Sequence, residues 1–170
     1  FSQIASFSND KDYYTEMKKD STIVVLTGNV AYDSAVRKAV ESLWITTPYS
    51  YKKLDPKTVE LKKGRNYLML LKLENSNKQE HFMVALVKGE DRKLNEYELS
   101  EIASYCTIDF KGVEKKWTEV FRRLSLVIYN IQNAIYLTET NKLSGNALAI
   151  NKELKTHYNS NTGMLKSKTL

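Results

Sequence analysis

The stretch Ser21–Val36, with the sequence STIVVLTGNVAYDSAV, decides how the fold is interpreted. Its apolar run Ile23–Leu26 has no polar face, which is typical of a strand buried on both sides of a sheet. Gly28 follows at once and offers the positive φ that a tight turn requires. The apolar residues after this glycine recur at the spacing of an amphipathic helix; they are Tyr32, Ala35, Val36, Ala39, Val40 and Leu43.

A second strand is predicted over residues 45–51, where β-branched and aromatic side chains dominate the sequence ITTPYSY. Pro48 lies inside this strand and has no N–H to donate, so we expect the strand at a sheet edge or at a bulge. A strand, a helix and a strand in this order predict a parallel βαβ unit with a right-handed crossover.

Two further strands are predicted over the apolar runs 67–71 and 82–87. The turn-forming stretch Asn75–Lys78 lies between them, so we expect an antiparallel hairpin. A helix of about two turns is predicted before this hairpin, because Asp55–Pro56 suits a helix start and Gly64 suits a helix end.

The rest of the chain has helical periodicity. Apolar stripes predict helices over residues 99–106 and 117–136, and a last helix over 147–158 that begins near Ser144 or Asn146. Strands without a polar face need cover on both sides. We therefore expect an α/β protein with a three-layer α/β/α arrangement, a mixed four-stranded sheet made of the βαβ unit and the hairpin, and a C-terminal helical half.

The length of 170 residues suits a single domain. Residues 1–20 are polar and are expected to form an N-terminal arm with a short helix at 12–19, and residues 21–170 are expected to form one α/β domain. The abrupt end after Gly163 leaves a C-terminal truncation open. The chain begins with Phe1, which fits removal of a signal peptide and an extracytoplasmic location, and equally fits a trimmed sequence. No apolar run reaches the roughly 18 residues of a membrane span.

The best candidate for a binding site is the turn formed by Thr27, Gly28 and Asn29, between the first strand and its helix. Ligands favour this place in α/β sheets because backbone N–H groups and the helix dipole point there. The sequence has neither the Lys-Ser/Thr ending of a Walker loop nor the three glycines of a dinucleotide fingerprint. We therefore favour a structural role, in which Gly28 makes the turn and Asn29 or Asp33 caps the helix.

Other reactive side chains show no catalytic pattern. His81 and His157 lie far apart and lack a third ligand at a metal-binding spacing. Cys106 is the one cysteine, so no internal disulfide forms, and its place on an apolar helical stripe favours a buried, inert thiol, with a Cys–His pair with His81 left open. Sequence spacing alone pairs none of the nearby carboxylates, which are Glu96, Glu98, Glu101, Asp109 and Glu114. The sequence thus implies no cofactor and no metal.

The net charge of +6 arises from 21 lysines and 5 arginines against 20 acidic residues. Residues 48–73 alone carry a net charge of +5, interleaved with Tyr49, Tyr51 and Tyr67. Basic patches with aromatic rings suit single-stranded nucleic acid. Arginine, which forms the bidentate phosphate contacts, is scarce here, so we favour a solvated basic surface over nucleic-acid binding.

Two functional hypotheses follow. The first is a non-catalytic binding or protein-interaction module of unknown specificity, because no catalytic pattern is present and the eleven tyrosines suit a recognition surface. The alternative is a domain that binds a small ligand or a nucleotide at Thr27–Asn29. The expected partner is accordingly a protein or a small ligand.

Overall fold

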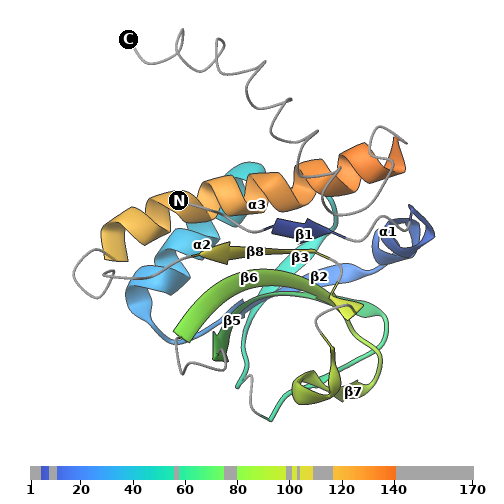
Figure 1. Cartoon of the computed structure of the whole chain (residues 1–170), viewed down its shortest axis with the longest axis horizontal. Coiled ribbons are helices and arrows are strands. Elements are labelled where there is room, and N and C mark those ends of the chain that lie inside the picture. Colours follow the sequence, from blue (N-terminus) through green and yellow to red (C-terminus); the bar gives the residue numbers. More distant parts are fainter. Residues whose placement is uncertain are drawn as a thin grey trace, which may run out of the picture.

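The computed structural model describes residues 5–7, 11–55, 58–74, 80–98, 101–102, 104–108 and 117–140. Figure 1 shows how the helices and strands follow one another along the chain. Their bounds are β1 Ala5–Phe7, α1 Lys11–Met17, β2 Ser21–Leu26, α2 Val30–Leu43, β3 Tyr49–Lys53, β4 Glu60–Leu61, β5 Arg65–Glu74, β6 Glu80–Lys88, β7 Arg92–Lys93, the 3-10 helix η1 Leu94–Glu96, β8 Ser104–Ile108 and α3 Trp117–Glu139.

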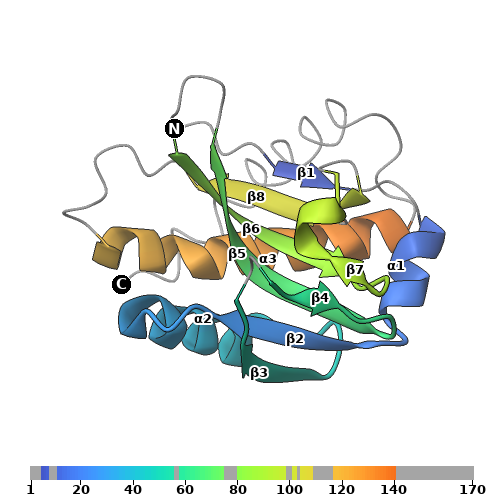
Figure 2. The same cartoon turned by 90° about the horizontal axis from the view of Figure 1, so that it is seen from below.

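Six strands form one mixed sheet in the order β1-β8-β6-β5-β2-β3 (Figure 2). Strand β2 runs parallel to both of its neighbours, so that Ile23 lies opposite Ser50 of β3 and Tyr67 of β5. Strands β5, β6, β8 and β1 pair antiparallel. The predicted α/β class with a mixed sheet is confirmed, and the four predicted strands lie side by side within it.

The sheet is wider than predicted because residues 104–108 form a strand. Their sequence SYCTI is rich in β-branched and aromatic residues, and the free edge of β6 accepts their backbone, with Tyr105 opposite Ala85. Strand β1 then pairs with the outer side of β8. The helix predicted over 99–106 is therefore wrong in its second half, because strand pairing overrides a helical spacing of apolar residues.

Two smaller elements also differ from the prediction. The second strand begins at Tyr49, four residues after the predicted start, because residues 45–48 form the loop that follows α2. The helix predicted from Pro56 is not seen in residues 58–64, where Glu60 and Leu61 form β4 and pair with β7. The Leu61 side chain is fully buried there, so its burial favours extended backbone over the capping signals.

The helices pack together on one face of the sheet, where they enclose the larger core (Figure 1). Helix α2 buries Tyr32, Val36, Ala39 and Val40, as their spacing predicts. Helix α1 adds Tyr14 and Met17, so the N-terminal residues 11–17 take part in the core. The strand side of this core consists of Val24, Leu68, Val84 and Leu86.

The opposite face of the sheet buries the alternate side chains of the same strands, as the lack of a polar face predicts. These side chains are Val25, Tyr67, Met69, Leu71, Met83, Ala85 and Val87. Among the described residues their cover is the block of β4, β7 and η1, with Leu61 and Ile102, and not a layer of helices (Figure 2). The expected three-layer α/β/α arrangement is accordingly not confirmed.

The long helix predicted over 117–136 is confirmed as α3, which continues to Glu139. Its buried residues form one stripe against the sheet and α2: Leu124, Val127, Ile128, Ile131, Ala134 and Ile135. The last predicted helix at 147–158 and the hairpin turn Asn75–Lys78 lie outside the described residues. No described helix combines the length and the apolarity that a membrane span needs.

Candidate functional site

The turn between β2 and α2 contains the three predicted site residues. Gly28 has a φ of +86°, as the turn was expected to require. Asp33 reaches back from the first turn of α2 and accepts the N–H groups of Thr27 at 2.9 Å and of Gly28 at 3.0 Å. The Thr27 hydroxyl donates to the same carboxylate over 3.2 Å. The turn is thus closed by a carboxylate of its own helix.

Asn29 is the N-cap of α2. Its Oδ1 accepts the N–H groups of Ala31 at 3.1 Å and of Tyr32 at 3.0 Å. Its own N–H donates to Thr27 Oγ1 over 3.2 Å. A helix start binds anions through backbone N–H groups that have no partner within the helix. Side chains of this turn already accept hydrogen bonds from five backbone N–H groups, those of residues 27, 28, 29, 31 and 32.

An exposed cation lies beside this turn. Leu26 at the end of β2 lies opposite Lys53 at the end of β3, and the Lys53 side chain extends over Gly28. Its Nζ would lie 2.9 Å from a Cβ atom placed on that glycine. The turn therefore has a lysine beside it, but its backbone N–H groups are already hydrogen-bonded. An anion that bound the N–H groups of Thr27 and Gly28 would have to displace the Asp33 carboxylate.

Strand β3, next to the turn, is the outer edge of the sheet in the described part of the chain. It pairs with β2 along its whole length and has no second neighbour among the described strands. All of its side chains are exposed except Tyr51, which is half-buried. An exposed edge presents a row of backbone donors and acceptors that another strand can pair with.

The pairing of β3 fixes which backbone groups point outward. The Thr22 N–H donates to the Pro48 carbonyl oxygen over 2.8 Å, so residue 48 and every second residue after it turn their polar backbone groups toward β2. The intervening residues Tyr49, Tyr51 and Lys53 turn theirs away from the sheet. These three residues therefore form the hydrogen-bonding edge.

Tyr51 ties this edge to α2. The guanidinium of Arg37 lies 4.1 Å from the centre of its ring, and its hydroxyl donates to Glu41 Oε1 over 3.3 Å. Tyr49 packs edge-on against Tyr51, with the ring centres 5.7 Å apart. Burial raises the pKa of Tyr51, and the Glu41 carboxylate acts in the same direction. The hydroxyl therefore stays protonated as a donor, and the ring is held in place.

His81 and Cys106 lie on neighbouring strands but do not face each other in the strand pairing. His81 lies near the start of β6, as expected, and Cys106 lies on β8 opposite Val84, so the predicted place of this cysteine on a helix is wrong. His81 and Val84 are three residues apart on β6, which separates the backbones of His81 and Cys106 by about 10 Å. His157 lies outside the described residues. Within the described ranges, no three His, Cys, Asp or Glu side chains are placed to hold a metal ion.

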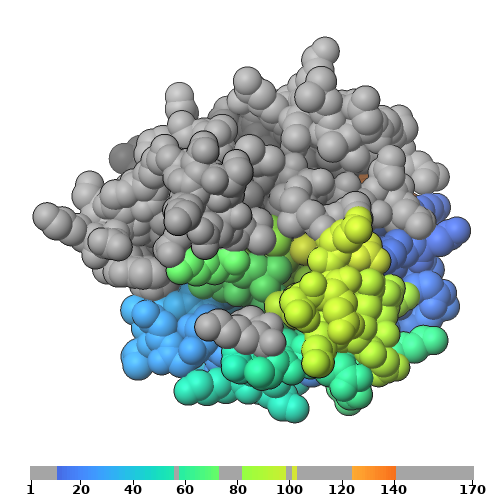
Figure 3. Space-filling view, turned by 60° about the horizontal axis from the view of Figure 1, so that its bottom comes forward, coloured from blue at the N-terminus to red at the C-terminus, as the bar shows by residue number. Residues whose placement is uncertain are grey.

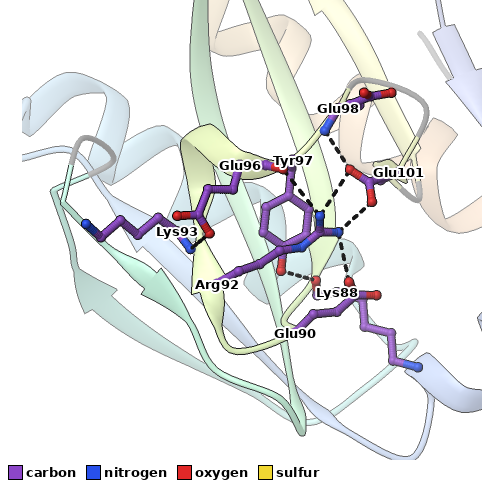
Figure 4. Close-up of polar contacts among 8 residues, drawn as sticks. All are labelled: Lys88, Glu90, Arg92, Lys93, Glu96, Tyr97, Glu98 and Glu101. Carbon is purple, nitrogen blue, oxygen red and sulfur yellow. Dashed lines mark hydrogen bonds and ion pairs between the residues drawn. The ribbon is translucent and has the colours of Figure 1, made fainter.

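Two carboxylates converge on Arg92 (Figure 4). One is Glu101, which the sequence left unpaired, and the other is Glu90, which the sequence did not single out. The Arg92 guanidinium donates to both carboxylate oxygens of Glu101, at 2.7 and 3.2 Å, and to Glu90 at 2.8 Å. It also lies 3.8 Å from the centre of the Tyr97 ring. Glu101 in turn accepts the N–H of Glu98 over 2.7 Å. We call this group of five residues the Arg92 cluster.

The charged groups of the Arg92 cluster clamp its backbone segments together. Hydrogen bonding from Arg92 holds the pKa of Glu101 below its ordinary value, and the same contact raises the pKa of Arg92. Both groups therefore stay ionised, with one cation between two carboxylates. Glu96 instead accepts the Lys93 N–H over 3.1 Å at the start of η1. Asp109 and Glu114 lie outside the described residues.

The clamp holds the block that covers the face of the sheet opposite the helices. In Figure 3 β7 and η1, in yellow-green, lie beside the turquoise residues around β4, and Glu60 of β4 pairs with Lys93 of β7. The Tyr97 hydroxyl donates to the Lys88 carbonyl oxygen over 3.0 Å, which anchors the block to β6. The sequence did not single out Arg92, because its partners follow no periodic spacing.

Two of the described basic residues of 48–73 are engaged by polar partners. Lys62 pairs with Glu60 at 2.8 Å, and Arg65 donates to the Ser21 hydroxyl over 2.7 Å. Tyr67 is buried, and its hydroxyl accepts the Lys62 N–H over 2.9 Å. An aromatic platform for bases needs exposed rings, which Tyr67 does not offer, whereas Tyr49 is exposed and Tyr51 is half-buried on β3.

A comparison of the sequence with known protein families and with curated proteins finds no match.

Proposed function

We propose that the chain is a non-catalytic protein-interaction module that binds an extended, acidic segment of a partner protein along the outer edge of β3. The observation that carries this proposal is the position of β3 at the edge of the sheet, paired on its β2 side only among the described residues. Addition of a strand to such an edge is a common mode of peptide recognition, because the main-chain hydrogen bonds supply affinity.

The side chains of β3 suit this mode of binding. Tyr49 and Tyr51 lie on the α2 side of the strand, and Lys52 lies on the other side. A tyrosine that is already held in place adds contact area with little loss of conformational entropy. Contacts with Arg37 and Glu41 hold Tyr51 in this way. The edge therefore offers backbone groups flanked by fixed rings.

Charge selects the kind of strand that fits. Lys52 and Lys53 are exposed, and no acidic side chain of the described part pairs with them. Like charges on an edge strand disfavour pairing with the same edge of a second copy. The same charges attract an acidic strand and speed its association. The partner segment is thus expected to carry Asp or Glu rather than Lys or Arg.

The test is fluorescence anisotropy with a labelled peptide of alternating glutamate and valine. The matched control peptide has lysine in place of each glutamate. We expect the acidic peptide alone to bind, with an affinity that falls as the salt concentration rises. Absence of binding by the acidic peptide at low salt contradicts the proposal.

A pair of variants at Tyr49 separates the contribution of the backbone N–H to peptide binding from the contribution of the side chain. Tyr49→Pro removes the outward N–H, and Tyr49→Thr removes the ring but keeps the N–H and a strand-forming residue. We expect Tyr49→Pro to bind the acidic peptide about tenfold more weakly than Tyr49→Thr, which is about 1.4 kcal/mol and within the range of one hydrogen bond. Equal affinities would show that the edge backbone does not take part.

One observation favours a second candidate function, which is binding of a small anionic ligand or a nucleotide at Thr27–Asn29. This observation is the approach of Lys53 to Gly28. The hydrogen bonds from Thr27 and Gly28 to Asp33 weigh against it. A thermal-shift screen with nucleotides and inorganic phosphate distinguishes the two cases, since a ligand at a hundred times its Kd adds about 2.7 kcal/mol of stability.

The Asn29→Ala variant gives the decisive comparison for this turn. Loss of an N-cap lowers the free energy of unfolding by about 1 kcal/mol, and this is the result we expect. If Asn29→Ala instead weakens the binding of a screened ligand and leaves stability unchanged, the turn is a ligand site.

A further inference from the structure

Arg37 on α2 lies beside the open edge of the sheet. Its guanidinium is 4.1 Å from the centre of the ring of Tyr51, which belongs to the edge strand β3. Within the described residues no carboxylate forms an ion pair with Arg37, and no other group accepts a hydrogen bond from its side chain. The planar fork of N–H donors on a guanidinium matches the two oxygens of a carboxylate. This half-buried cation is therefore able to bind a carboxylate from a partner.

The nearest acid on the same helix is engaged elsewhere. Glu41 follows Arg37 by four residues, a spacing at which opposite charges often pair on a helix. Its Oε1 instead accepts the Tyr51 hydroxyl over 3.3 Å. Tyr51 thus contacts both charged side chains, and the charge of Arg37 is not neutralised by an ion pair with its own helix.

A strand added to β3 would place side chains next to this cation. Tyr51 projects on the α2 side of the sheet, and side chains alternate between the two sides along a strand. The residue of the added strand that lies directly opposite Tyr51 projects on the same side, with its Cβ about 5 Å from the Cβ of Tyr51. A glutamate at this position has a side chain long enough for its carboxylate to reach the guanidinium beside the ring.

A second cation stands on the same side of the edge. Lys53 lies two residues further along β3 and reaches over the turn at the start of α2. Glu41 and Asp33, on this side, already accept hydrogen bonds from other groups of the chain. In a strand of alternating glutamate and valine, every glutamate lies on one side. Glutamates on the α2 side meet Arg37 and Lys53, whereas the other side of β3 offers Lys52.

We propose that Arg37 recognises the acidic side chain of the bound segment, by forming a bidentate pair with the glutamate that lies opposite Tyr51 on the α2 side of the added strand. This inference rests on the proposed function and deepens it, since it names the side chain that selects an acidic segment. The Tyr51 ring holds the guanidinium in place before binding, so less conformational entropy is lost when the pair forms.

Two glutamine variants test this role with the glutamate–valine peptide. Arg37→Gln removes the guanidinium. Lys38→Gln is the matched control, because it removes an equal charge from the next residue of α2, which is exposed and points about 100° further around the helix. Glutamine is a good helix former, so both variants are expected to fold, which circular dichroism verifies.

We expect Arg37→Gln to bind the peptide about tenfold more weakly than Lys38→Gln in fluorescence anisotropy, which is the loss typical of hydrogen bonds to a charged group. Equal affinities of the two variants, with the wild-type protein binding the peptide, would overturn the role of Arg37 and leave the proposed function standing. Failure of the wild-type protein to bind the peptide would instead contradict the proposed function itself, together with the inference that rests on it.

The NMR signal of the Arg37 Nε–H group distinguishes a direct contact from an effect through the Tyr51 ring. The signal is assigned by its absence from the spectrum of Arg37→Gln. We expect it to shift when the glutamate–valine peptide is added to the wild-type protein, because a carboxylate then accepts hydrogen bonds from the guanidinium. An unchanged signal, together with weaker binding by Arg37→Gln, would show that Arg37 only positions the ring and would overturn the inference.

Discussion

Asp33 Oδ2 accepts the N–H of Gly28 over 3.0 Å, so the first turn of α2 closes the loop from which the helix begins. The position that an incoming anion would take at this helix start is occupied by a carboxylate of the chain itself. The same turn has the exposed Lys53 beside it. The N–H donors of this turn are therefore already satisfied by a carboxylate of the chain. For this reason the proposed function is placed on the neighbouring β3 edge.

Replacing Asp33 by alanine is expected to free the N–H groups of Thr27 and Gly28. The lost charge-assisted hydrogen bonds should lower the free energy of unfolding by about 1–2 kcal/mol, since the group is half-buried. Sulfate should then stabilise Asp33→Ala more than it stabilises the wild-type protein, which urea denaturation with and without sulfate measures. Equal stabilisation of both proteins by sulfate would show that the Asp33 carboxylate does not occupy an anion-binding position at this turn.

Two glycines are expected to respond differently to alanine. Gly28→Ala forces a side chain into a positive φ, at about 1–2 kcal/mol, and the Cβ meets only the flexible end of Lys53. Gly89→Ala places a Cβ 2.0 Å from the backbone oxygen of Lys62, which cannot move away easily. Its cost should reach about 3 kcal/mol. Chemical denaturation measures both, and a milder effect at Gly89 than at Gly28 would contradict the close approach of these two backbones.

The buried face of α2 is tested by two aspartate substitutions. Val36 is fully buried against the sheet, whereas Lys38 is exposed. Val36→Asp should lower the free energy of unfolding by about 4 kcal/mol or more, because an unpaired charge enters the core. Lys38→Asp should change it by about 0.5 kcal/mol or less. Similar losses in thermal denaturation of the two variants would rule out the orientation of α2.

The Arg92 cluster predicts a dependence of stability on pH. Hydrogen bonding from Arg92 lowers the pKa of Glu101, so this contact stabilises the folded state above the ordinary glutamate pKa of about 4.3 and is lost as the pH falls through the lowered value. The difference in stability between wild type and Arg92→Gln should therefore be largest near neutral pH and shrink in acid.

Urea denaturation across a pH series measures this difference. Lys62→Gln is the matched control, because it removes an exposed cation that pairs with Glu60 on the same block, and such pairs contribute little. If the difference in stability between wild type and Arg92→Gln stayed constant down to acidic pH, the stabilising effect of Arg92 would not depend on the ionised Glu101 carboxylate.

The elements that the sequence predicted well are those whose own residues settle their structure. The run Ile23–Leu26, the turn at Gly28 and the stripe of α2 lie next to one another in the chain, so spacing alone predicted β2, its turn and α2. Tyr32 and Val36 are buried as their periodicity required. The N-cap was predicted to be Asn29 or Asp33, because capping depends on residue type and position, and Asn29 takes this role.

The elements that were missed depend on distant partners. Residues 104–108 become a strand because they pair with the edge of β6. Leu61 lies in extended backbone that buries its side chain in the core on the face of the sheet opposite the helices. No local pattern reports either condition. The Arg92 cluster joins Arg92 to Glu90 and Glu101, which lie two and nine positions away in the sequence. This part of the backbone has no regular repeat, so periodic spacing could not predict the contacts. The residues of β3 whose backbone groups point away from the sheet could not be predicted either, because this depends on the register in which β3 pairs with β2.

Amide hydrogen exchange at the edge of β3 tests the central claim most directly. The exchange rates of the N–H groups of Tyr49, Tyr51 and Lys53 are measured by NMR with and without a saturating amount of the glutamate–valine peptide. The account predicts that the peptide slows exchange at these three amides and leaves Thr27, Gly28 and Asn29 unchanged, because a bound strand would accept the outward N–H groups. Unchanged exchange along β3, or protection confined to Thr27–Asn29, would contradict it.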